Sequence, residues 1–164
     1  MKCPVIILLI KILCMTPLSK AQEQDQRLDY FIGEWKSVSV SQTTKEEIAG
    51  HSIIKRVIEE KWLEWIFRMP LSDGELEVIT LINYDQEKKQ YGFYSFNPMD
   101  KEPIPHFGNW IDAKRLQIKT DFGGDAVWVE FVLQDDSSFE QIHYHLTSDR
   151  EKEITSITIY SKLK

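Results

Sequence analysis

Apolar and polar residues alternate along most of the chain, and the alternation is clearest between residues 61 and 69. One face of this segment carries Leu63, Trp65, Phe67 and Met69, and the other carries Trp62, Glu64, Ile66 and Arg68. A period of two residues is typical of a β-strand, whose successive side chains point to opposite faces. Similar patterns, rich in β-branched and aromatic residues, predict nine further strands, at 35–41, 51–58, 75–84, 90–96, 106–112, 115–120, 126–133, 139–147 and 154–161.

Turn-forming residues separate these segments at intervals typical of hairpins. Asp73-Gly74 is a strong signal for a two-residue turn, and polar turns follow at 85–88 and 148–150. Between the strands, no stretch of about ten residues keeps a helical period, which disfavours a parallel α/β fold. We therefore predict an all-β domain, a single antiparallel up-and-down barrel of about eight to ten strands. A two-sheet sandwich is the alternative.

The segment before the first strand has a different pattern. Leu28, Phe31 and Ile32 recur at helical spacing, and Gly33 then permits a tight turn before Trp35. A tryptophan here supplies a large buried area and an indole N–H donor. We therefore expect a short helix at 28–32 that caps one end of the barrel, with Trp35 plugging that end.

The first 21 residues resemble an export signal. A positive start is followed by apolar residues, and Ser19 and Ala21 give the small-x-small pattern of a cleavage site. Lys11 interrupts the apolar stretch, which disfavours a membrane-spanning helix and any stable membrane insertion. We expect a signal peptide at 1–21, cleavage near Ala21, and a secreted or periplasmic barrel domain at 22–164.

The two cysteines, Cys3 and Cys14, both lie in this leader. Anchoring by a lipid at Cys14 is a minor alternative, because Leu13 stands where a lipoprotein signal has a small residue. A chain that starts at Gln22 has no thiol, which excludes disulfides, cysteine nucleophiles and thiolate metal sites from the mature domain.

The chain is acidic, with 20 basic and 26 acidic residues and a net charge of −6. Removing the three leader lysines (Lys2, Lys11 and Lys20) leaves 17 basic residues and a net charge of −9. There is no basic patch with interleaved aromatic residues, so nucleic acid and anionic membranes are not expected partners. The sequence does not indicate an oligomeric state.

Several motifs, taken in order, resemble those of lipocalin-like (calycin) barrels, and more narrowly those of an exported bacterial family of unknown function with that fold. They are Leu28…Phe31-Ile32-Gly33-Glu34-Trp35, Trp62-Leu63-Glu64-Trp65, Asn83-Tyr84-Asp85…Lys88…Tyr91 and Asn109-Trp110-Ile111-Asp112. The resemblance implies a barrel with an internal cavity, and it implies no catalytic residues. The expected function is to hold a small apolar or amphipathic ligand in that cavity.

The face of each strand that lines the cavity decides which residues bind a ligand. If the face of Glu64 and Arg68 points inward, Arg68 can anchor a ligand carboxylate and Glu64 can hold it in place. The opposite face, from Leu63 to Met69, is favoured as the interior because it buries no charge. The candidate ligand-binding residues are Trp62, Glu64, Arg68, Tyr94, Trp110 and Trp128.

The histidines provide the alternatives to simple binding. His143 and His145 share one face of their strand, where two imidazoles can share a metal or one can ligate haem. Nitrobindins, which resemble this chain in the early Gly-x-Trp step, bind haem through a histidine on a late strand. We expect no cofactor, with haem as the alternative. His51, at a strand start, or His106, at a barrel mouth, could also transfer protons with a carboxylate, the enzymatic alternative.

Overall fold

The computed structural model describes residues 26–122 and 125–164. The predicted signal peptide and both cysteines lie outside these residues. A four-residue 3-10 helix, η1 (Leu28–Phe31), precedes ten strands in the described part of the chain. The strands are β1 (Gly33–Ser41), β2 (Glu47–Val57), β3 (Trp62–Leu71), β4 (Gly74–Asp85), β5 (Gln90–Phe96), β6 (Ile104–Trp110), β7 (Arg115–Phe122), β8 (Asp125–Asp135), β9 (Ser138–Leu146) and β10 (Lys152–Lys162).

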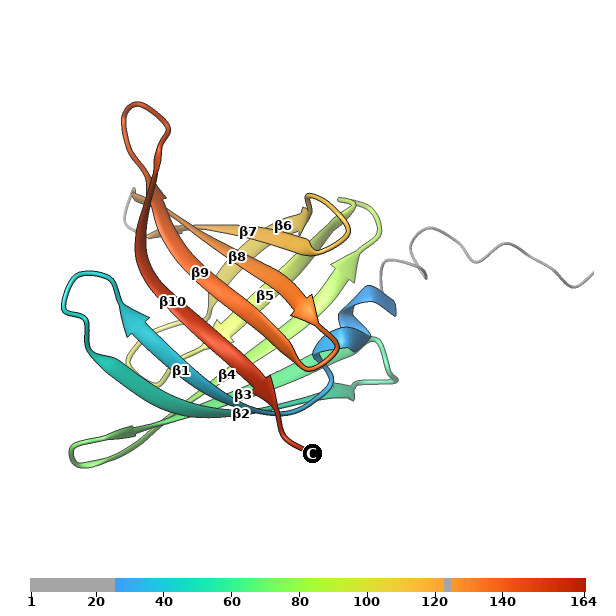
Figure 1. The fold of residues 1–164 in the computed structure, drawn as a ribbon. Helices are drawn as coiled ribbons and strands as arrows, with labels where there is room; N and C mark the ends of the chain where they lie inside the picture. The colour runs from blue at the N-terminus through green and yellow to red at the C-terminus, as the bar shows by residue number, and fades with distance from the viewer. Residues whose placement is uncertain (1–25, 123–124) are drawn as a thin grey trace, which may run out of the picture.

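The strands form one closed antiparallel barrel (Figure 1). Each strand pairs with its neighbours in sequence, and β1 closes the ring by pairing with β10, with Trp35 opposite Lys162. The predicted single up-and-down barrel is confirmed, and the sandwich alternative is excluded. Closure gives every strand two partners, so the barrel has no free edge. Among the described residues, no helix is long and apolar enough to cross a bilayer.

The boundaries differ from the predicted ones mainly in length. The helix is one turn of 3-10 type that ends at Phe31, since Ile32 already has an extended backbone. Strand β2 begins four residues before its predicted start, at Glu47, and β10 begins two residues earlier, at Lys152, and ends one residue later than predicted. Ladder hydrogen bonds of the backbone do not depend on side-chain polarity, so the pairing continues where the pattern has ended.

One end of the barrel is filled by the end plug, which consists of Leu28, Phe31 and Trp35. All three are buried, and the Trp35 side chain has no exposed surface. The indole N–H of Trp35 donates a hydrogen bond to the Phe31 carbonyl at 2.8 Å, which ties the helix to the first strand. Gly33 has a φ of 139°, so the turn between them requires a residue without a Cβ.

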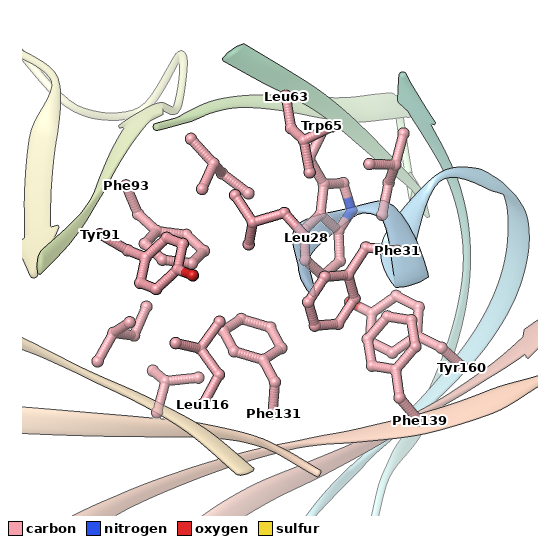
Figure 2. Packing of buried hydrophobic residues seen from close by; sticks show 14 of the residues in the cluster. Leu28, Phe31, Leu63, Trp65, Tyr91, Phe93, Leu116, Phe131, Phe139 and Tyr160 are labelled. Carbon is pink, nitrogen blue, oxygen red and sulfur yellow. The ribbon is translucent and has the colours of Figure 1, made fainter. Parts of the chain in front are cut away.

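Aromatic rings from several strands pack against the end plug (Figure 2). The ring of Phe139 lies 4.8 Å from that of Trp35 and 5.1 Å from that of Phe31, both edge to face. Tyr160 stacks on Phe139 at 4.3 Å between centroids. The predicted plug at Trp35 is therefore confirmed, and the core of the protein is concentrated at this end.

Candidate ligand-binding cavity

A cavity of about 330 Å³ lies inside the barrel, on the far side of the core from the end plug. This volume is at the lower end of the range for small-molecule pockets. The lining reaches Ile48, which is exposed, next to the β1–β2 turn at the end opposite the plug. The lining residues are Ser39, Ile48, Trp65, Phe67, Met69, Val78, Thr80, Phe93, Ser95, His106, Ile118, Val129, Phe131, Gln141, His143, Ser156, Thr158 and Tyr160.

The inward face of β3 is the uncharged one. Trp65, Phe67 and Met69 line the cavity, as the argument from charge burial favours. The other face points outward, so Glu64 and Arg68 form surface ion pairs with neighbouring strands. Glu64 lies 3.0 Å from the Lys55 ammonium, and Arg68 lies 2.7 Å from a Glu77 carboxylate oxygen. The idea that Arg68 and Glu64 meet a ligand inside the barrel is thereby corrected.

The other four candidate residues also lie outside the cavity lining. Trp62 and Tyr94 pack on each other on the outer surface, with ring centroids 5.9 Å apart. Trp128 is also on an outward face and stacks on Tyr144 at 6.4 Å. Trp110 points inward but at the plugged end, where it stacks on Phe31 at 6.3 Å.

Aromatic side chains form the inner wall of the cavity, nearest the plug. Phe93 and Phe131 stack with centroids 5.9 Å apart, although they come from β5 and β8. The Trp65 indole packs on Phe131 at 5.6 Å, and its N–H donates to the Ser52 hydroxyl at 2.9 Å. The only polar atom of these three side chains is therefore satisfied outside the cavity, so they present apolar surface to it.

Polar side chains lie among this apolar surface, and several already bond to one another. The hydroxyls of Thr80 and Ser95 are 3.0 Å apart, and the Tyr160 hydroxyl donates to Gln141 Oε1 at 2.9 Å. Burial raises the pKa of Tyr160, so its hydroxyl stays protonated and remains a donor. These pairs lower the cost of placing polar groups inside the barrel.

Two histidines from distant strands also line the cavity. Burial, together with the repulsion that a second proton would meet beside His143, lowers the pKa of His106 from 6.5 to about 4. Burial likewise lowers the pKa of His143. Both imidazoles are therefore neutral at pH 7, which leaves the cavity uncharged.

The two histidines that meet in the structure are His106 and His143, whereas the sequence suggested His143 and His145. His106 lines the cavity near the mouth, as proposed, and its neighbour there is His143 rather than a carboxylate. His145 is not in the lining; it faces a shallow surface pocket with Trp128 and Leu146. His51 lies within β2 on the outer surface, with Nε2 3.9 Å from a Glu34 oxygen.

The chemistry of the lining bears on the two alternative functions. Among the lining residues there is no Asp, Glu, Lys or Arg. The His–carboxylate pair needed for proton transfer is therefore missing from this cavity. Haem would find an imidazole for its iron and apolar walls for its ring, but no cation to pair with its propionates. The residues present thus do not fit haem as a whole. No group of three or more metal-ligating side chains occurs in the described parts of the chain.

One carboxylate on the outward face of the barrel is buried under neighbouring side chains, and it was not predicted from the sequence. Glu130 is 4 % exposed and accepts hydrogen bonds from Gln117 Nε2 at 2.9 Å, the Tyr144 hydroxyl at 3.1 Å, and Lys152 Nζ. Burial would raise the pKa of Glu130, but these hydrogen bonds and the Lys152 charge hold it below its ordinary value. Gln117 and Tyr144 come from the two strands that flank β8, and Lys152 comes from β10, one strand further, so the network links β7, β8, β9 and β10.

Comparisons with known proteins support the fold and go no further. No protein-family model matches the chain, and no curated protein matches it in sequence. The solved structure of the S-type phycobiliprotein lyase CPES from Guillardia theta is similar, with a TM-score of 0.63 and 11% identity. The similarity covers 85% of this chain and 92% of that one. The crystal structure of Rv2717c from M. tuberculosis is similar with a TM-score of 0.63 and 8% identity, over 85% of this chain and 96% of that one. These similarities confirm the predicted single antiparallel barrel at the level of the fold.

Proposed function

We propose that this barrel binds a small apolar or amphipathic molecule in its cavity. The observation that carries the proposal is the cavity itself, about 330 Å³ of space in a barrel whose other end is fully packed. Ten of the eighteen lining residues are apolar or aromatic, eight are polar, and none carries a formal charge at pH 7. This combination is typical of sites in which apolar area gives affinity and a few polar atoms orient the ligand.

Two neighbouring positions on β4 allow a direct test of the proposal with naphthalene as the probe. Val78 lines the cavity, whereas Ile79 points outward between Ile66 and Phe96. The change Val78→Trp fills part of the cavity and should weaken naphthalene binding at least about tenfold, measured by fluorescence titration. The change Ile79→Trp adds the same side chain outside and should leave binding unchanged.

Two outcomes of this titration would contradict ligand binding in the cavity. One is wild-type protein that does not bind naphthalene. The other is a folded Val78→Trp variant that binds it as well as the wild type does. Circular dichroism of both tryptophan variants shows whether each has kept its fold.

The leader supports a proposal about location, namely that the protein belongs to an exported bacterial family and reaches the periplasm or the medium. The support is the order of charge, apolar stretch and small-x-small site that ends at Ala21. The intact mass of the protein recovered from its own cells should correspond to a chain that starts at Gln22. A mass that includes residues 1–21 would exclude cleavage there, and a diacylated Cys14 would identify an anchored lipoprotein instead.

A further inference from the structure

The inference starts from the His143 side chain. His143 lies on β9 between Val129 of β8 and Ser156 of β10, and all three residues line the cavity. The backbone carbonyl of His143 accepts a hydrogen bond from the Thr155 hydroxyl at 3.1 Å. Its imidazole, in contrast, has no hydrogen bond to any residue that the structure describes. A buried polar group without such a bond has the capacity to bond a ligand.

The polar groups of the cavity differ in this respect. Thr80 is paired with Ser95, and Gln141 accepts from Tyr160, so these four side chains already use part of their bonding capacity. The His143 imidazole keeps one N–H donor and one nitrogen acceptor when it is neutral. A hydroxyl group on a ligand can match both, because it also has one donor and can accept.

The absence of formal charge in the lining determines which polar head group fits. A carboxylate brought into the cavity would lose its hydration and meet no Lys or Arg among the lining residues. It could gain a partner only if an imidazole took up a proton, and burial opposes this at His106 and at His143. An uncharged hydroxyl has no such requirement. The site therefore favours a neutral head group over an acidic one.

On the basis of the proposed ligand binding, we propose that His143 is the head-group subsite of the cavity and that the ligand class is an uncharged alcohol or phenol with an apolar body. His143 bonds the hydroxyl, and the stacked rings of Phe93 and Phe131 pack on the apolar part. The same body with a carboxylate is rejected. Ser156, which is opposite His143 in the β9–β10 ladder, places its own hydroxyl beside the hydroxyl of the ligand.

Three probes with one ring system test this assignment: naphthalene, 2-naphthol and 2-naphthoate. At pH 7, the wild type should bind 2-naphthol about threefold to tenfold more tightly than naphthalene, as expected for one added hydrogen bond. It should bind 2-naphthoate at least about tenfold more weakly than 2-naphthol. The change His143→Phe keeps a flat ring and should abolish the preference for 2-naphthol while naphthalene still binds. The change His145→Phe, two residues along β9 and outside the lining, should keep the preference.

The outcomes separate this inference from the proposed function. If naphthalene does not bind, the proposed ligand binding fails and the subsite fails with it. If naphthalene binds but 2-naphthol is not preferred, or if 2-naphthoate binds as tightly as 2-naphthol, only the subsite is wrong. Should His143→Phe not fold, NMR of the wild type decides, because 2-naphthol should shift the His143 ring signals and leave those of His145 in place. Unmoved His143 signals in saturated protein would overturn the assignment.

Discussion

Replacing Trp35 with alanine is expected to lower the free energy of unfolding by about 3–5 kcal/mol. The indole is fully buried and packs edge to face against Phe139, so its removal leaves a void at the plugged end. It also leaves the Phe31 carbonyl without its 2.8 Å donor. Urea denaturation of the wild type and the variant gives this difference in unfolding free energy. A common m-value is used only where the two fitted slopes agree.

A second substitution at the same position separates packing from hydrogen bonding. The change Trp35→Phe keeps most of the aromatic volume and removes only the N–H donor, so it should cost about 1–3 kcal/mol. If both variants lose less than about 1 kcal/mol, the end plug does not stabilise the barrel as described. Hydrogen exchange should further show faster opening of residues 28–31 in both variants, because the bond from Trp35 to the helix is gone.

Acidification is expected to destabilise the protein between pH 6.5 and about 4, because of the cavity histidines. Burial and the nearby His143 lower the pKa of His106 to about 4, whereas in the unfolded chain it titrates near 6.5. The unfolded state therefore binds the proton first as the pH falls, and the free energy of unfolding decreases. The full difference for His106 is about 3 kcal/mol, of which about 2 kcal/mol should be lost between pH 7 and 4.5. The lowered pKa of His143 acts in the same direction.

Urea denaturation at intervals from pH 7 to 4.5 measures this loss, and the change His106→Gln provides the control. The variant cannot take up a proton at this position, so most of the loss should disappear. The carboxylates with lowered pKa values, such as Asp112 and Asp135, begin to lose their contribution only below about pH 4. An equally steep loss in the variant would show that His106 is not the group responsible.

The sequence predicted the strands well because period two is a local property. The alternation at 61–69 identifies a strand whatever its partners are, and the short segment at 28–32 already pointed to the plugged end. The pattern could not by itself decide which face lines the cavity, because both faces of β3 carry aromatic residues. The cost of burying charge correctly favoured an outward orientation for the side chains of Glu64 and Arg68.

The candidate site itself was poorly predicted because it depends on contacts between distant strands. His106 and His143 are 37 residues apart, and only the closure of the barrel brings them into one cavity. Trp128 and Tyr94 seemed suited to binding because they are aromatic, yet they pack on other rings of the outer surface. Exposed aromatic residues are common in folded proteins, so residue type alone does not locate a cavity. The one sequence signal for His143 was its position on the same strand face as the apolar residue Phe139.

The pairing of β1 with β10 places the two ends of the folded domain side by side, next to the end plug (Figure 1). Trp35 is opposite Lys162, and the turns between β1 and β2 and between β9 and β10 lie at the other end. Any tether joined before residue 26 or after the last strand would therefore hold the barrel by its packed base. A surface, an affinity tag or a fused protein attached there would leave the cavity mouth facing away from the attachment. The domain is thus suited to immobilisation at either terminus without obstruction of the cavity mouth.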